Sequence, residues 1–484
     1  MPEAPFRRLG FSDFTSAYRS GSTTPLAVAN NCLQAVRVSD GHEPPLRAVI
    51  RLLDDTALAE AEASTERYER GEPRSPIDGI PVMFKDNLDI AGVETTNGTR
   101  LSFPVPTRTA RVVERLRDAG AIVVAKTNLH EIGAGTTGIN PHHGTPRNPY
   151  DIRCWCGGSS SGSASAVGAG LTPLAIGSDA GGSVRAPAAF VGAVGLKPTF
   201  GRVSRIGLSI VCDTLDHLGP ITTSCRDAAL ALCAIGGVCR DDEETWDQPP
   251  LPDYDAAGAL LTGDVSKRRI GFARRLLEHH QVDPAVAAHV ERAARALQDA
   301  GATLVDVDVP SLDFCRNVGL LLLGAEGVSG LEEFLFRHER ELGHDLQVLL
   351  RVGAEISARD YLQAQRVRNE IRAEWAGILA GLDAVLTPGP GLVAQPIRPD
   401  AERTGELDEA HSAKAISNTF PQNLTGFPAV TVPCGFAGGM PVSAQIIAAP
   451  WRELSALDIG VAIERAQPAA PLRPARFYGD RLLS

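Results

Sequence analysis

The chain lacks the features that membrane, nucleic-acid-binding and secreted proteins need. No apolar run approaches the roughly 18 residues of a membrane-spanning helix, and Val318–Gly324 has only the length of a core segment. The formal net charge of −11 leaves no excess of lysine and arginine for phosphate binding. Residues 1–10 contain no apolar segment of the kind found in a signal peptide. We expect a cytoplasmic protein that binds neither membrane nor nucleic acid.

The cysteines and aromatic residues also exclude several kinds of site. The nine cysteines show no paired metal-ligand spacing, because Cys154-Trp155-Cys156 is one residue shorter than CxxC and has no second pair. An odd number of cysteines in a chain of 484 residues is typical of reduced thiols. We expect no metal and no organic cofactor. An alternative is that Cys154 or Cys156 acts as a catalytic nucleophile. Aromatic residues make up 5% of the chain, which gives little basis for an aromatic cage.

Helical segments alternate with short apolar strands along the chain. A helix is expected from Thr24-Pro25 to about Val38, and an Ala-rich helix over about Thr56 to Arg70. Two segments share a helix–glycine–strand pattern with a buried strand, Ala110–Ala125 and Pro284–Val309. Further strands are expected at Gly79–Phe84, Arg269–Ala273, Ala384–Thr387, Ala429–Val432 and Ser443–Ile447.

This alternation predicts an α/β fold with a central twisted, mostly parallel or mixed β-sheet that helices cover on both faces. The length would allow about three domains. We expect one large domain over residues 1–484, with a helical subregion at about 327–382 packed on that same domain.

Two serine clusters flanked by glycine are the most informative part of the chain. They are Gly157–Ser163 and Gly177–Arg185, and upstream of them Lys85 ends an apolar run. Glycine permits tight turns and lets a ligand approach backbone N–H groups. A serine beside such a turn can act as a nucleophile, and nearby N–H groups can bind a developing oxyanion. The sequence therefore predicts an acyl-transfer enzyme.

Other interpretations of these clusters are weaker. Gly158–Gly162 formally matches the GxSxG nucleophile elbow, but the preceding Asn148–Cys156 has loop signals where that motif needs a strand. A phosphate-binding loop would need a lysine that is missing here. A Ser–His mechanism would draw on histidines in the stretch after the predicted strand, namely His130, His142 and His143.

A different mechanism, a relay of two serines and a lysine, agrees with a family resemblance. The run Gly157–Thr199 resembles the amidase signature family. Five more segments agree with that family in the same order: Gly79–Val82, Lys85-Asp86-Asn87, Thr127-Asn128, Gly144–Asn148 and Gly426–Val430. The resemblance spans most of the chain and is densest at about 77–227.

The resemblance implies a role for individual residues. Ser183 falls on the acylated nucleophile, Ser159 on a bridging serine held by a cis peptide bond, and Lys85 on the general base. The two serines are 183 − 159 = 24 residues apart, the spacing of the family. The backbone N–H groups of Ala180, Gly181 and Gly182 would form the oxyanion hole. Ala180 replaces a common threonine of the family and Ser161 a common glycine, and neither change removes a backbone donor.

The proposed base must be neutral to accept a proton. An unperturbed lysine, with a pKa of about 10.4, is roughly 0.04% neutral at pH 7. Burial of Lys85 beside Phe84 would favour the neutral amine, whereas a nearby carboxylate would oppose it. We therefore predict that Asp86 points away from Lys85.

The neighbouring polar residues are expected to support the site. Asp179 and Arg185 flank the nucleophile and are expected to brace its loop, together with Ser160. As serines in a Gly-rich turn, Ser160, Ser161 and Ser163 are also expected to act as helix caps.

The expected activity is hydrolysis of a linear carboxylic amide through a seryl acyl-enzyme, with release of an acid plus ammonia or an amine. The expected partner is a small-molecule amide, and a homodimer is left open. One alternative is the glutaminase (A) subunit of a tRNA-dependent amidotransferase, which works with partner subunits. A non-catalytic scaffold of the same fold is a second alternative, and transfer of the acyl group to an acceptor other than water is a third. The sequence does not identify the amide.

Overall fold

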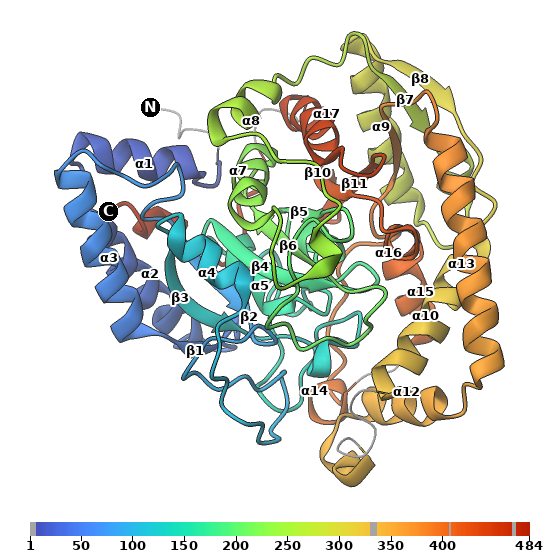
Figure 1. Ribbon diagram of the computed structural model, residues 1–484, viewed down its shortest axis with the longest axis horizontal. Coiled ribbons are helices and arrows are strands. Elements are labelled where there is room, and N and C mark those ends of the chain that lie inside the picture. The colour runs from blue at the N-terminus through green and yellow to red at the C-terminus, as the bar shows by residue number, and fades with distance from the viewer. Residues whose placement is uncertain (1–5, 330–335, 406–407, 467–470) are drawn as a thin grey trace.

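The computed structural model describes residues 6–329, 336–405, 408–466 and 471–484. Its core is one mixed β-sheet with helices on both sides (Figure 1). In sheet order the strands are β1 (Val49–Leu52), β3 (Ile122–Thr127), β2 (Pro81–Lys85), β4 (Leu174–Asp179), β6 (His217–Thr222), β5 (Val194–Lys197), β10 (Ala429–Ala437), β11 (Met440–Ile447), β9 (Ala384–Pro388), β7 (Arg269–Phe272) and β8 (Thr303–Asp306).

Parallel and antiparallel pairs occupy different parts of this sheet. β2 runs parallel to both β3 and β4, and β7 runs parallel to both β8 and β9. The strands between these two groups are antiparallel, from β4–β6 through β10–β11 to β11–β9. The predicted α/β fold with a mixed sheet is confirmed.

The helices lie around this sheet. They are α1 (Phe11–Ser20), α2 (Pro25–Asp40), α3 (Asp54–Glu69), α4 (Arg111–Asp118), α5 (Ser161–Gly168), α6 (Arg185–Phe190), α7 (Cys225–Ile235), α8 (Tyr254–Leu260), α9 (Pro284–Asp299), α10 (Leu312–Ser329), α12 (His344–Ala354), α13 (Ala358–Leu379), α14 (Ala401–Thr404), α15 (Glu409–Ile416), α16 (Phe420–Thr425) and α17 (Glu453–Arg465). Short 3₁₀ turns cover Glu131–Gly133, Glu243–Thr245, Arg274–Glu278, Glu339–Glu341 and Gly479–Arg481. Within the described ranges, no helix is both long enough and apolar enough to cross a bilayer.

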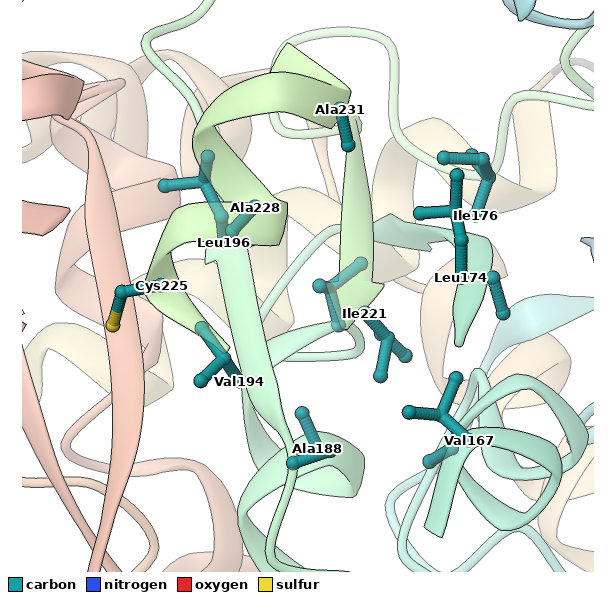
Figure 2. Packing of buried hydrophobic residues seen from close by; sticks show 14 of the residues in the cluster. Val167, Leu174, Ile176, Ala188, Val194, Leu196, Ile221, Cys225, Ala228 and Ala231 are labelled. Atoms are coloured by element: carbon teal, nitrogen blue, oxygen red, sulfur yellow. The ribbon is translucent and has the colours of Figure 1, made fainter. Parts of the chain in front are cut away.

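The main core lies between the sheet and its helices. Figure 2 shows Val167 of α5 and Ala188 of α6 near the apolar residues of β4, β5 and β6, with Ala228 and Ala231 of α7 on the same cluster. These side chains are fully or almost fully buried. Small alanines let the helices approach the sheet closely, which fixes the loops that connect them.

Several predicted elements form where expected. The hydroxyl of Thr24 accepts the N–H of Ala27 and so caps α2, whose first residue is Pro25. One expectation about burial is wrong: β8, the second strand of the repeated helix–glycine–strand pattern, is half exposed. It is the last strand of the sheet, and so has a neighbour on one edge alone.

The helical subregion expected at about 327–382 contains α12 and α13, which lie with α10 at one side of the sheet (Figure 1). Residues 330–335 of that subregion fall outside the described residues.

Candidate active site

The predicted site residues lie at the carboxyl ends of two neighbouring strands and in loops close to those ends. Lys85 is the last residue of β2, while Ser178 and Asp179 end β4. Because β2 and β4 are parallel, their carboxyl ends lie at the same edge of the sheet, which is where α/β proteins bind ligands. Ser159 precedes α5, and Ser183 follows β4.

Lys85 lies at the centre of this arrangement. Its side chain is completely buried, and its Nζ donates hydrogen bonds to Ser159 Oγ at 2.7 Å and to Ser178 Oγ at 2.8 Å. The peptide bond between Gly158 and Ser159 is cis.

The surroundings of Lys85 favour its neutral form. Burial lowers the pKa of Lys85 to about 7, although the carboxylates of Asp216 and Asp179 act in the opposite direction. The prediction that Asp86 points away agrees with the geometry, because its Oδ1 lies 2.8 Å from Nζ of Lys126. Its Oδ2 accepts hydrogen bonds from Thr96.

Ser183 lies next to the segment that holds Ser159. The N–H of Ser160 donates to the carbonyl oxygen of Ser183 at 3.2 Å, so the two serine turns are directly linked. Ser183 is partly exposed and lines a cavity of about 490 Å³ together with Ala180 and Gly181. Ser183 is thus open to a ligand, whereas Lys85 and Ser159 lie behind it in the protein.

Asp179 organises the turn that carries Ser183. Its carboxylate accepts the N–H groups of Gly182 at 2.8 Å and Val184 at 3.1 Å. Arg185 donates to both oxygens of Asp179, at 3.0 and 3.1 Å, and both side chains are fully buried. Burial alone would raise the pKa of Asp179, but the Arg185 guanidinium holds that pKa well below its usual range.

This arrangement changes the expected oxyanion hole. The N–H of Gly182 is already engaged by Asp179, so it is not a free donor. In the described part of the chain, the N–H groups of Ala180 and Gly181 have no acceptor. Gly182 has a φ of +133°, and a Cβ there would lie 2.1 Å from Thr419 Oγ1, so glycine is required at this position.

The expected capping role of the other serines is wrong. Ser160 stands at the N-cap of α5, but its hydroxyl donates to the carbonyl of Ser178 at 3.1 Å. The hydroxyl of Ser163 contacts the carbonyl of Ile176 at 3.3 Å, and Ser161 Oγ has no partner within the described residues. These serines instead lie inside the protein against β4 and β3, and the hydroxyls of Ser160 and Ser163 bond to groups of those strands instead of capping the helix.

The histidines are engaged with other groups. His130 Nε2 lies 2.7 Å from Asp345 Oδ2, His142 Nε2 lies 2.5 Å from Glu131 Oε1, and His143 Nε2 contacts the carbonyl of Thr99 at 2.9 Å. No hydrogen bond joins any of these rings to Ser159 or Ser183 within the described ranges. His130 does line the cavity.

The alternative nucleophiles are poorly placed. Cys154 and Cys156 are buried, and burial raises the pKa of Cys154 to about 11 and that of Cys156 further. Such thiols carry little thiolate near neutral pH. Among the described residues, no group of three or more His, Cys, Asp or Glu side chains could hold a metal ion.

Sequence reasoning missed Ser178. Its Oγ accepts from both Lys85 Nζ and Asn87 Nδ2, the latter at 3.0 Å, and thereby fixes the position of the amine. The sequence did contain a signal for Ser178, because Gly177-Ser178-Asp179 lies immediately before the turn that carries the nucleophile. Strand β4 itself was not predicted, so nothing placed Ser178 beside Lys85.

Comparisons with known proteins agree with this architecture. The amidase family model matches residues 33–457. A fatty acid amide hydrolase from Arabidopsis thaliana is 34% identical, over 99% of this chain and 79% of the plant protein. The A subunit of the glutamyl-tRNA(Gln) amidotransferase from Chloroflexus aggregans is 35% identical, over 95% of this chain and 96% of that protein.

A solved structure of a known enzyme has the same fold as this chain. The peptide amidase from Stenotrophomonas maltophilia superposes with a TM-score of 0.83 at 32% identity, covering 96% of this chain and 98% of that enzyme. The family model, the relatives and the shared fold lead to one conclusion: this chain belongs to the amidase signature family and is an amide-cleaving hydrolase.

Proposed function

We propose that this enzyme hydrolyses a linear carboxylic amide through an acyl-enzyme on Ser183, with Ser159 and Lys85 as the proton relay. The observation that carries the proposal is the 2.7 Å contact between Ser159 and a buried amine whose pKa is about 7. At this pKa, about half of the lysine is neutral at pH 7, and the neutral amine can act as a base.

The first half of the reaction forms the acyl-enzyme. Ser183 Oγ attacks the carbonyl carbon, its proton passes to Ser159, and the proton of Ser159 passes to Lys85. The carbonyl oxygen becomes an oxyanion, which the free N–H groups of Ala180 and Gly181 stabilise. The relay then runs backward: Lys85 returns a proton through Ser159 to the amide nitrogen, the C–N bond breaks, and ammonia or an amine leaves.

The second half releases the acid. A water molecule loses a proton through Ser159 to Lys85 and attacks the acyl carbon. The bond between the acyl carbon and Ser183 Oγ then breaks, and Lys85 returns the proton through Ser159 to Ser183 Oγ, which restores the free enzyme. Asp179 and Arg185 serve as positioning residues, because they fix the turn that presents Ser183 and the oxyanion donors. Ser160 supports the same turn through its N–H bond to the Ser183 carbonyl.

Labelling with a fluorophosphonate tests the nucleophile and the base together. We expect mass spectrometry to find the label on Ser183 in the wild type. Labelling should be lost in S183A and slowed by a factor of about a thousand or more in K85A. H130Q is the matched control, because His130 lines the same cavity but contacts Asp345. Rapid labelling of K85A together with loss of labelling in H130Q would favour the Ser–His mechanism.

The similarity to amidotransferase subunits supports a second candidate, a glutaminase that works with partner subunits. Turnover of simple amides by the purified chain alone favours the free amidase. Glutamine hydrolysis that appears only when partner subunits are added would favour the second candidate. Absence of any fluorophosphonate labelling would favour a non-catalytic scaffold.

A further inference from the structure

Arg316 is a buried cation in the wall of the cavity that contains Ser183. It lies on α10, and its side chain is 8% exposed. Within the described residues, its Nε and Nη2 atoms have no hydrogen-bond partner. A guanidinium that leaves water without such partners carries a large desolvation cost, and its place at the cavity therefore indicates that a ligand supplies them.

One carboxylate lies close to Arg316 but is poorly aligned with it. Glu409 Oε1 is 2.7 Å from Arg316 Nη2, yet the two groups lack the geometry of a hydrogen bond. The Glu409 side chain is 71% exposed and belongs to the first turn of α15. An ion pair with a solvated partner contributes little to stability, so another anion can displace Glu409 into water at little cost.

The unbonded edge of Arg316 is the edge that holds carboxylates elsewhere in this chain. The Nε–H and Nη2–H bonds of a guanidinium point in the same direction and can bind both oxygens of one carboxylate. Arg67 binds Asp78 with these two atoms, and Arg185 binds Asp179 in the same way. In the described part of the chain, the corresponding two atoms of Arg316 have no such partner.

The other acidic side chains of the cavity wall are already engaged. Asp345 Oδ2 lies 2.7 Å from His130 Nε2. Asp408 accepts the backbone N–H of His411 at 2.9 Å and thereby caps α15, where the helix dipole favours a negative charge. The charges of these two carboxylates are thus partly balanced, which leaves Arg316 to attract an anion.

The ring of Phe420 connects the nucleophile turn with α10 and sets the distance to Arg316. A Cβ on Gly181 would lie 2.8 Å from this ring, and a Cβ on Gly319 would lie 2.1 Å from it. Arg316 precedes Gly319 by about one helical turn. Because the amide carbonyl faces Gly181 in the proposed reaction, a group that reaches Arg316 must lie several bonds from the scissile carbon.

The proton relay decides which part of the substrate extends toward Arg316. The leaving nitrogen must face Ser159 to receive a proton, and Ser159 is buried behind the cavity beside Lys85. The acyl part of the amide is therefore the part that extends into the cavity.

We propose that Arg316 is a specificity-determining residue, which binds a carboxylate at the far end of the acyl part of the substrate and releases Glu409 to water. The favoured substrates are then anionic amides whose carboxylate lies several bonds from the scissile carbon. This inference rests on the proposed function, since the direction of the acyl part follows from the Ser159–Lys85 relay.

Pairs of amides test this inference. Each pair contains the monoamide of a linear dicarboxylic acid, from succinic to suberic acid, and the alkanamide of equal chain length, which ends in a methyl group. We define the carboxylate preference as the ratio of their kcat/KM values, and expect it to reach about 30 or more at the best chain length. A ratio of one or less at every length would overturn the inference. N-(carboxyalkyl)acetamides carry the carboxylate on nitrogen, and a preference confined to that series would also overturn it.

Variants of the ion pair test the two residues. R316M removes the guanidinium but keeps an unbranched side chain, and should lower the carboxylate preference about 30-fold. R316K keeps the charge without the two parallel donors, and should retain a small part of the preference. E409Q removes the competing carboxylate, and should raise the preference severalfold through a lower KM for the monoamide. R295M is the matched control, because Arg295 pairs with Glu291 on α9 and does not line the cavity.

The same measurements show which result would contradict the inference. An equal loss for both members of each pair in R316M would indicate a structural role for Arg316. If R316M does not fold, E409Q still decides, since Glu409 is exposed and an unchanged preference in E409Q would contradict the displacement. Fluorophosphonate labelling of the wild type separates the two proposals. Labelled Ser183 without a carboxylate preference would refute this inference alone, whereas absence of labelling would refute the proposed function.

Discussion

Asp86 pairs with Lys126 and not with Lys85, the residue that precedes it in the chain. Asp86 Oδ1 lies 2.8 Å from Nζ of Lys126, and both side chains are buried. Two lysines on neighbouring strands thus have opposite surroundings: Lys126 has a carboxylate, and Lys85 has two serine hydroxyls. A carboxylate at Lys85 would favour its ammonium form and so weaken it as a base.

The first prediction concerns the pH dependence of activity. Because Lys85 must be neutral to accept a proton and its pKa is about 7, kcat/KM should rise with pH through a midpoint near 7 and stay high above it. Steady-state kinetics from about pH 5 to 9 measure this midpoint. An unperturbed histidine would give a similar midpoint, so the same profile must be recorded for H130Q. Loss of the midpoint in H130Q would contradict the assignment to Lys85.

The second prediction concerns the pH dependence of stability. The pKa of Lys85 falls from 10.5 to about 7 on folding, so between these values the unfolded chain binds more protons than the folded protein. This lysine therefore destabilises the fold near pH 7, and the effect fades as the pH rises. Between pH 7 and 9, the unfolding free energy of the wild type should rise relative to that of K85M by about 2 kcal/mol. Denaturant titrations at both pH values measure the difference, and a constant difference would contradict a depressed pKa.

The third prediction concerns the buried ion pair. D86N should destabilise the protein by about 3–5 kcal/mol, because it leaves the Lys126 ammonium buried without its carboxylate. The double variant D86N/K126M should recover part of that loss in chemical denaturation. Variants that retain activity should keep the wild-type pH midpoint, since Asp86 does not contact Lys85. A double variant as unstable as the sum of both single variants would show that the pair is not coupled.

The fourth prediction concerns Ser178. S178A removes the acceptor for Lys85 Nζ and Asn87 Nδ2, so the amine is free to move from Ser159. We expect kcat to fall by about 10- to 100-fold, with little change in KM. S178T keeps the hydroxyl and should restore part of the rate. S163A is the matched control, because this buried serine contacts Ile176 and Thr127 and not the lysine. An equal loss of kcat in S163A would indicate a general packing effect.

The sequence by itself determined the class of the fold and predicted candidate residues for the site. Its alternating helices and strands predicted an α/β fold, and Thr24 and Pro25 marked the start of α2, because caps and periodicity are local properties. Lys85, Ser159 and Ser183 were predicted as catalytic residues from the resemblance of several short motifs, in the same order, to the amidase signature family. Strands β1, β4, β5 and β6 were missed. Glycines and a proline weaken the strand signal of β4, β5 and β6, and β1 is only four residues long.

The tertiary structure alone decided which of these residues meet and in what surroundings. The parallel pairing of β2 with β4 brings Ser178 to Lys85, although 93 residues separate them. The same packing removes Lys85 from water and assigns Asp86 to Lys126, which together set the charge of the amine. It also brings α10 and α12 together as walls of the cavity. Burial, partner choice and cavity shape depend on contacts between distant segments, and local sequence patterns carry little information about such contacts.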